Sequence, residues 1–586
     1  MQLIIRDLIY RSPLKIYALA ALMTGSLASC ADFLDRYPQD SVNNETYWKT
    51  EEQLRAALYP CYEAFHKDLL INMSEATAET CMWGDITSGL SKVSGGKHSY
   101  TDGFPFTTYW ARIYASIFNC NNFLDNYNKA EMPQDDKDVY AAEVKVIRAY
   151  MYFLLTTFWG DTPWIDHVIT ADEAYVPRDP RSKVIDNVIS DLQWAASKLP
   201  EERQLGDNVG RIDRWGALAM LARVALQNER YDIAISASKE IIDHGPYDLW
   251  DYAKVYQTEG DVENNPANIE SIIFSIYIPD IRMNNLSNET CCPVDYIRLN
   301  ASKSLVDAYL CTDGKPAKAG LEYYHNNNIV TSDLYKFPEE HYADYFQNRD
   351  PRMAMTLYCP GDAWPGGDDG DSEERKPNKT FNLPRFSSLQ SGINGANTRT
   401  GFYFKKYNDP NIAGNPNMSH TNLNVIRYPE VLLIYAEALY KTNGTLTQPQ
   451  IDETINKLRK RVGMHEMRLE ELAAWNLDLW TEIKRERRIE MTMDGMRYAD
   501  ILRWREGELR FGRAITGPSA QVCINDLGAN PYADNGVDEF GDIIYEKSRA
   551  EGGARYFDPN MHYLWPVPYA ERVKNPLLGQ NPGWPQ

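Results

Sequence analysis

The chain has 586 residues and a formal net charge of -21, with 43% hydrophobic and 24% charged residues, an ordinary globular composition. This acidic balance argues against nucleic acid as a partner, because phosphate recognition requires clustered Lys and Arg. The nine cysteines contain no two paired Cys-x-x-Cys motifs, which argues against a zinc site and favours buried free thiols over disulfides.

The N-terminus has the pattern of an exported protein. Arg6, Arg11 and Lys15 precede an apolar run over residues 16–28, which is too short to span a bilayer comfortably. The run ends in Leu27-Ala28-Ser29-Cys30, which resembles a bacterial lipobox, where the chain is cut just before an acylated cysteine. We therefore expect residues 1–29 to be removed and Cys30 to anchor the protein in a membrane. The alternative is an ordinary signal peptide with an incidental Cys30.

Helical patterns dominate the chain after this leader. A helix is expected within residues 141–161, where an apolar stripe is stopped by Gly160. Residues 214–243 predict two antiparallel helices joined near residues 228–230. Their small residues Ala222 and Ala234 stand twelve apart, as in a tetratricopeptide unit.

The C-terminal half repeats this character. Residues 427–444 predict a comparable helix that ends at Gly444, with its partner expected in residues 448–464. One further amphipathic helix is expected within residues 479–504, and a strand within residues 271–278.

Long segments rich in Gly, Pro, Asn, Asp, Ser and Thr separate these helices, at residues 84–108, 311–424 and 515–560. Irregular loops of such length are uncommon in compact proteins unless they are functional. We therefore predict a mainly α fold, in which a tetratricopeptide-like helical scaffold carries long irregular loops and a few short strands.

Seven segments in order along the chain resemble the SusD/RagB family of outer-membrane nutrient-binding lipoproteins. They are CADFLDRYPQDSV, RAYMYFLLTTFWGDTPWI, RWGALAMLARVAL, RDPRMAMT, IRYPEVLLIYAEAL, IKRERRIEMTMDGMRYADILRW and LWPVPYAERVKNPLLGQNPGW. The chain departs from the family pattern at Trp159 and at residues 493–497, which are scaffold positions. The resemblance implies a signal peptide over 1–29, an N-terminal region with tetratricopeptide-type helices over 30–250, and a C-terminal region with ligand-binding loops over 251–586.

The resemblance also implies a function. Family members bind poly- or oligosaccharide at the cell surface and deliver it to a TonB-dependent, SusC-like transporter in the outer membrane. It implies no cofactor, no metal and no catalysis. Two alternatives stay open: a peptide-binding counterpart of the RagB type, and an all-helical carbohydrate-active enzyme.

Two acidic patterns could suggest other chemistry. Arg485, Glu486, Arg487, Arg488 and Glu490 form a dense charge run, for which a buried Arg–Glu network is favoured over a catalytic acid. Glu437 is interpreted in the same way.

The acidic stretch 368–374 could bind calcium, but it lacks the spacing of a calcium loop, so a solvated loop is favoured. No nucleophile-elbow, zinc-protease or phosphate-loop motif is present.

Candidate ligand contacts are aromatic residues in loops with polar neighbours. Aromatic rings pack on the C–H face of a sugar, while amide, carboxylate and guanidinium groups bond its hydroxyls. For each aromatic residue the alternative is a buried loop anchor. The candidates are Trp83, Tyr100, Tyr296, Tyr323, Tyr324 and Trp364, with Asn284, Asn285 and Arg298 as polar partners.

Overall fold

We describe the protein from a computed structural model. The structure describes residues 47–85, 87–291, 297–318, 328–335, 339–364, 379–389, 396–409, 418–545 and 555–586.

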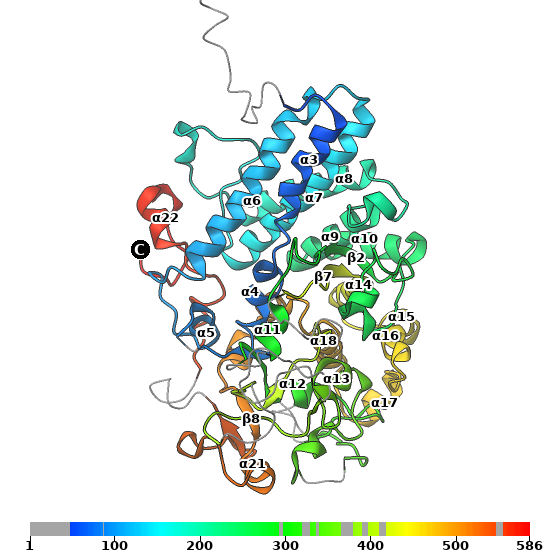
Figure 1. Cartoon of the computed structure of the whole chain (residues 1–586), viewed down its shortest axis with the longest axis vertical. Coiled ribbons are helices and arrows are strands. Elements are labelled where there is room, and N and C mark those ends of the chain that lie inside the picture. Colours follow the sequence, from blue (N-terminus) through cyan, green and yellow to red (C-terminus); the bar gives the residue numbers. More distant parts are fainter. Residues whose placement is uncertain are drawn as a thin grey trace, which may run out of the picture.

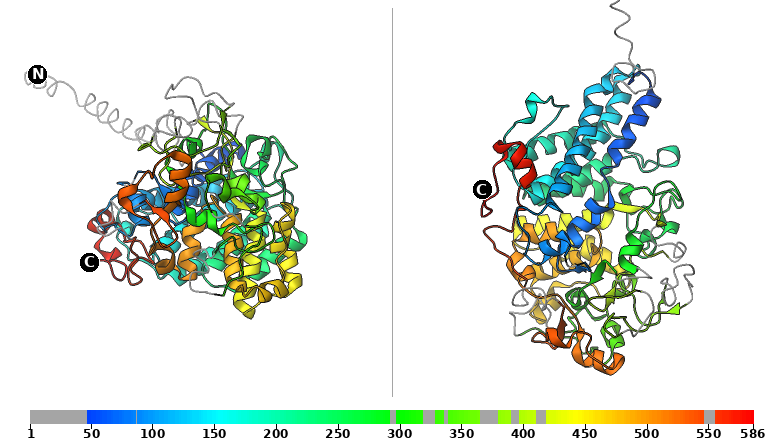
Figure 2. Two further views of the ribbon diagram at one scale, coloured as in Figure 1. Left: turned by 90° about the horizontal axis from the view of Figure 1, so that it is seen from below. Right: turned by 60° about the vertical axis from the view of Figure 1, so that its left-hand side comes forward.

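Long helices stacked side by side form one end of the molecule, and short elements joined by loops form the other (Figure 1; Figure 2). The long helices are α3 (Glu51–Tyr62), α6 (Phe106–Asn126), α7 (Gln134–Phe158), α8 (Arg181–Lys198), α9 (Arg214–Gln227), α10 (Tyr231–His244) and α14 (Tyr428–Asn443). From α6 to α10 each helix packs on the next, and α10 packs on α14. This arrangement confirms the predicted mainly α, tetratricopeptide-like scaffold.

Helix α7 runs through the centre of the scaffold. Asp135 and Asp136 in its first turn complement the helix dipole, and nearly every side chain from Tyr140 to Phe158 is buried. A helix that is buried on nearly all sides belongs in the interior of a large protein. The chain leaves α7 through Gly160, whose φ of +76° lies in the left-handed region that glycine adopts without strain. The predicted helix and its stop are confirmed.

The predicted helix pair is also confirmed as α9 and α10. The Asp213 side chain caps α9 by accepting a hydrogen bond from the backbone N–H of Gly216, and the connection spans only residues 228–230. Ala222 and Ala234 are both 0% exposed, so these small side chains allow the two helices to approach closely.

Helix α14 ends, as predicted, at Gly444, which has a left-handed φ of +74°. The partner helix expected in residues 448–464 is divided into two short helices, α15 (Gln448–Glu453) and α16 (Ile455–Arg461), which meet at Thr454.

The single helix predicted within residues 479–504 is wrong. The structure has two helices there, α18 (Leu479–Glu490) and α19 (Arg497–Trp504). Between them Gly495 has φ +76°, and a Cβ atom on it would lie 1.5 Å from the carbonyl oxygen of Leu70. The backbone turns here because a distant segment packs directly on it, and the apolar periodicity of the sequence does not reveal that contact.

The charge run on α18 has the structural role predicted for it. Arg485, Glu486, Arg487, Arg488 and Glu490 are all buried. Glu486 pairs with Arg352 at 2.6 Å and with Arg459 at 2.8 Å, which ties α18 to other segments. Glu437 likewise pairs with Arg503 at 2.9 Å.

Short helices and strands make up the rest of the fold; most lie in the other half of the molecule, whereas the last helix packs against α6 (Figure 1). The helices are α4 (Met73–Glu75), α5 (Gly89–Ser94), α11 (Leu286–Cys291), α12 (Lys303–Ala308), α13 (Pro351–Thr356), α17 (Leu469–Ala474), α20 (Gly507–Phe511), α21 (Ala520–Leu527) and α22 (Tyr569–Lys574). The strands are β1 (Cys81–Trp83), β2 (Ser271–Ser275), β3 (Leu299–Ala301), β4 (Ala363–Trp364), β5 (Lys379–Thr380), β6 (Phe402–Tyr403), β7 (Leu423–Arg427), β8 (Thr516–Ser519) and β9 (Asp542–Ile544). They pair antiparallel as β1–β3–β6, β2–β7, β4–β5 and β8–β9, and β2 confirms the predicted strand.

Two further observations concern the described part of the chain. None of its helices combines the length and the apolar character that crossing a membrane requires. Six of its cysteines, Cys61, Cys81, Cys120, Cys311, Cys359 and Cys523, are free thiols, and five of these are buried, which agrees with the favoured interpretation of these residues.

Candidate functional site

Several predicted site residues lie outside the described residues. These are Cys30, Tyr296, Tyr323 and Tyr324, together with the acidic stretch 368–374.

The structure brings Trp83 and Arg298 together at the end of the β1–β3 pair. Trp83 is the register partner of Leu299, and the backbone N–H of Gly84 donates a hydrogen bond to the carbonyl oxygen of Arg298 at 2.6 Å. The Ser91 hydroxyl of α5 donates to the Trp83 carbonyl at 3.1 Å and to the Asp85 carbonyl at 2.7 Å. Backbone pairing and this hydroxyl therefore fix the segment that carries the half-buried indole.

A carboxylate and a guanidinium group accompany the indole. Asp85 accepts hydrogen bonds from the hydroxyl and the backbone N–H of Thr87, at 2.8 and 3.0 Å. Partial burial would raise the pKa of Asp85, but the Thr87 hydrogen bonds and the positive charge of Arg298 outweigh it and lower the pKa. The carboxylate is therefore ionised at neutral pH. We call Trp83, Asp85 and Arg298 the Trp83 surface.

Of the two predicted asparagines, the structure buries Asn284 and exposes Asn285. Asn284 forms a backbone bridge with Ser419, and its side-chain oxygen accepts from the N–H of Leu286 at the start of α11. Its role is therefore to shape the loop. Two backbone hydrogen bonds link Asn285 to Arg298 through Glu289: the Glu289 N–H donates to the Asn285 carbonyl at 3.0 Å, and the Arg298 N–H donates to the Glu289 carbonyl at 2.7 Å.

Tyr100 lies on a different loop, against the C-terminal region. Its ring meets that of Tyr569 edge to face, with ring centroids 6.1 Å apart. Lys92 and Asp102 pair at 2.8 Å and fasten this loop to α5.

The prediction of Trp364 as a ligand contact needs correction, because its side chain is 1% exposed. Tyr358, Phe381 and Tyr403 surround the indole, with ring centroids at 4.7, 5.7 and 5.2 Å. Trp364 lies in the short β4–β5 pair and has the alternative role that we considered, that of a buried loop anchor. It is not part of the Trp83 surface.

The Trp83 surface has the groups that a sugar-binding site requires. Trp83 offers a half-buried indole, and the adjoining segments offer an acceptor in Asp85 and donors in Arg298, whose charge acts on Asp85. In the described part of the chain, no group of three or more His, Cys, Asp or Glu side chains has the arrangement of a metal site.

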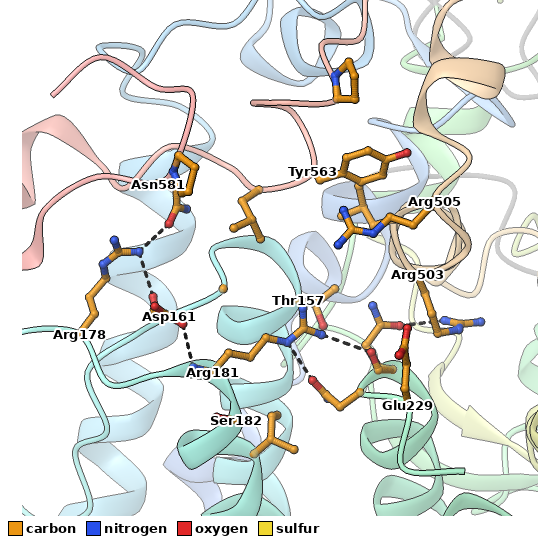
Figure 3. Close-up of a pocket in the computed structure, with 18 of the residues that line it drawn as sticks. Thr157, Asp161, Arg178, Arg181, Ser182, Glu229, Arg503, Arg505, Tyr563 and Asn581 are labelled. Carbon is orange, nitrogen blue, oxygen red and sulfur yellow. Dashed lines mark hydrogen bonds between the residues drawn. The ribbon is translucent and has the colours of Figure 1, made fainter.

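A large pocket of about 590 Å³ was not predicted from the sequence (Figure 3). Its walls come from the end of α7, the start of α8, the α9–α10 turn, the end of α19 and the C-terminal segment. The arginines Arg178, Arg181 and Arg505 line it and were not singled out, because residues so far apart in the chain show no joint pattern. The nearest signal was the pair of arginines in the segment VPRDPR, residues 176–181.

Two family models match the chain. The model described as "SusD family" matches residues 293–584, and the model described as "Starch-binding associating with outer membrane" matches residues 32–226. A SusD-like protein of Formosa agariphila is 25% identical over 515 residues, which cover 82% of this chain and 88% of that protein.

Solved structures agree with this match. The fold is similar to that of a SusD-like carbohydrate-binding protein from Bacteroides fragilis, with a TM-score of 0.74 and 23% identity, covering 91% of this chain and 100% of the other. The surface glycan-binding protein A from Bacteroides fluxus has a TM-score of 0.59 and 20% identity, covering 92% and 100%. Two family models that together span most of the chain, the curated relative and the shared fold lead to one conclusion: the chain belongs to the SusD family.

Proposed function

We propose that this protein is an outer-membrane lipoprotein that captures an oligo- or polysaccharide at the cell surface and delivers it to a partner TonB-dependent, SusC-like transporter. The observation that carries the proposal is the family match over residues 32–226 and 293–584. Two structural neighbours are named as carbohydrate- or glycan-binding proteins. As a member of this family, the chain is a binding protein and not an enzyme.

The Trp83 surface is proposed as a point of glycan contact. An indole held by strand pairing loses little conformational freedom when a sugar ring packs on it. Tyr296, which follows the loop of residues 284–295 in the sequence, is a further proposed contact. Tyr100, Tyr323, Tyr324 and Asn285 are proposed contacts as well.

We expect Trp83→Ala to weaken binding of the recognised glycan by roughly thirtyfold, which corresponds to ~2 kcal/mol for an aromatic anchor. The measurement is affinity electrophoresis of the full chain in gels that contain a panel of polysaccharides, followed by calorimetry on the best ligand. Trp83→Phe should retain part of the affinity, because it keeps an aromatic face.

Trp194→Ala is the matched control, since Trp194 is a half-buried indole on α8, outside the Trp83 surface. Equal weakening by both alanine variants would show that Trp83 acts only through stability. Binding to peptides and to no glycan would replace the proposal with the RagB-type function, and release of reducing sugar would restore the enzyme alternative.

The lipid anchor has a separate test. We expect Cys30→Ser to move the protein from the membrane fraction to the soluble fraction, because acyl chains on Cys30 supply the membrane affinity. Cell fractionation and immunoblotting measure this, with Cys359→Ser as a control at another cysteine. Retention of the Cys30 variant in the membrane would contradict the proposed anchor.

A further inference from the structure

The 590 Å³ pocket at the α7–α8 junction is lined by five arginines: Arg178, Arg181, Arg230, Arg503 and Arg505. Carboxylates neutralise two of them, since Arg230 pairs with Asp186 at 3.2 Å and Arg503 pairs with Glu437 and Asp500 at 2.9 Å. The other three form no ion pair with any carboxylate of the described residues.

Neutral groups hold these three guanidinium groups in place. Arg178 donates through Nε to the carbonyl of Leu578 and through Nη1 to Asn581 Oδ1, both at 2.6 Å. Arg181 donates through Nε to Asn228 Oδ1 at 2.8 Å and through Nη2 to the carbonyl of Gln227 at 3.2 Å.

Arg505 lies over the ring of Tyr563, 4.5 Å from its centroid. Figure 3 shows Arg178 and Arg181, from the segment at the start of α8, and Arg505, from the end of α19, at the walls of the pocket. The hydrogen bonds and the stacking orient the three cations, and none of these side-chain contacts is made to a carboxylate.

The surroundings of the pocket make that charge costly. Burial lowers the pKa of Arg181 and the nearby Arg505 lowers it further, and together they outweigh the opposing charges of Glu229 and Asp161. Burial and the charge of Arg572 also lower the pKa of Arg178, although Asp161 opposes them. Asp161 and Glu229 line the same pocket, but both are exposed and neither forms an ion pair with the three arginines. An anion that enters between the guanidinium groups would relieve this repulsion.

The size and the remaining walls of the pocket suit a small ligand. A volume of 590 Å³ lies within the range of sites that enclose small molecules or a few sugar rings. The planar fork of arginine matches the paired oxygens of a carboxylate or a sulfate group. The chain as a whole has a net charge of -21 and repels anions at long range, so an anion is attracted only where cations converge locally.

We propose that this pocket binds the acidic group, carboxylate or sulfate, of a charged sugar residue, and that it gives the protein a preference for acidic over neutral glycans. The inference rests on the proposed glycan-binding function and deepens it by naming the chemical class of ligand. It also assigns a role to the C-terminal segment 559–582, which forms one wall of the pocket.

The test is calorimetric titration of the full chain with tetragalacturonate as the uronate probe, a carrageenan tetrasaccharide as the sulfate probe and maltotetraose as the neutral probe. We expect at least one acidic probe to bind more tightly than the neutral one, and its affinity to fall on raising the salt concentration from 20 to 200 mM. The acidic probe that binds more tightly shows whether the pocket prefers a carboxylate or a sulfate group.

Variants locate the effect. Arg505→Gln removes an exposed cation whose contact in the structure is the Tyr563 ring, and we expect about tenfold weaker binding of the acidic probe, as for the loss of one charge-assisted hydrogen bond. Arg505→Lys keeps the charge and should recover part of the affinity. Arg178→Gln provides a second, independent variant and should weaken binding similarly. Arg468→Gln removes an exposed cation outside the pocket and should leave the affinity unchanged.

Three outcomes would overturn the inference. If the neutral probe binds and neither acidic probe does, the pocket does not bind acidic sugars. The proposed glycan-binding function would still stand. If Arg468→Gln weakens binding of the acidic probe as much as Arg505→Gln does, the affinity depends only on the net charge of the protein. Tighter binding of hexaglutamate than of either acidic sugar assigns the pocket to an acidic peptide. Binding of no glycan at all is a different failure, because it overturns the proposed function itself.

Discussion

Glu490→Gln is expected to destabilise the protein by about 4 kcal/mol, because breaking a buried ion pair leaves uncompensated charge in the interior. Glu490 is 0% exposed on α18. Both of its oxygens accept hydrogen bonds from Arg461 at 2.7 Å, while Arg427 and Arg352 approach to 3.2 Å. The amide of glutamine cannot neutralise three guanidinium groups. Urea unfolding followed by circular dichroism measures the loss, as a lower transition midpoint.

The pH dependence of this effect separates charge from packing. Burial would raise the pKa of Glu490, but Arg461, Arg427 and Arg352 outweigh it and hold the pKa well below its ordinary value of 4.5. A depressed folded-state pKa gives stability that is present above the unfolded value and is lost as the pH falls below it. The difference in unfolding free energy between wild type and Glu490→Gln should therefore shrink between pH 7 and pH 3.

Glu466→Gln is the matched control. Glu466 pairs with Lys460 at 3.0 Å on the surface, where an ion pair contributes at most about 1 kcal/mol. A pH-independent difference for Glu490→Gln, or an equal loss in both variants, would contradict the role assigned to the buried carboxylate.

Trp159→Ala is expected to cost about 3–5 kcal/mol, the range for removing a large buried aromatic side chain. Trp159 follows α7 and is 0% exposed. Its ring meets Trp565 and Trp110 edge to face, with ring centroids 5.2 and 5.5 Å apart. Its Nε1–H donates to the carbonyl of Pro566 at 3.1 Å, so alanine also leaves that buried acceptor without its partner. Unfolding midpoints in urea measure the total loss.

The Trp159 side chain also fastens the end of the chain, because the indole bonds to the Pro566 carbonyl and packs on Trp565. We therefore expect Trp159→Ala to speed proteolytic cleavage within residues 555–586 more than cleavage elsewhere. Trp159→Phe should restore part of both properties, because it refills most of the cavity. Cleavage that starts instead in the α9–α10 turn would contradict this role.

Regular periodicity explains the parts of the fold that the sequence predicted. The stripes of α7, α9 and α14 repeat over several turns, and each helix ends where a glycine or a short polar turn interrupts the pattern. Gly495 shows the limit of this approach. Its turn depends on the Leu70 carbonyl, more than 400 residues away in the chain, and no local pattern includes that contact.

The candidate site was less predictable for the same reason. Trp364 stands among Gly, Pro and Asp in the sequence and so resembles an exposed loop residue, but Tyr358, Phe381 and Tyr403 bury it from other segments. Trp83 and Arg298 lie more than 200 residues apart in the sequence, and only the β1–β3 pairing brings their backbone segments together. The arginine pocket draws on five separate segments, so its charge emerges only in three dimensions.

The packing of the C-terminal segment against α7 has a consequence for how the protein matures. Trp565 stacks at the end of α7, its N–H bonds to the Phe158 carbonyl at 2.7 Å, and Figure 1 places the C-terminus beside the N-terminal helices. A ribosome delivers the N-terminal helices long before residue 565 emerges, so these helices cannot complete their core during synthesis. The chain therefore remains incompletely folded until its last residues are made.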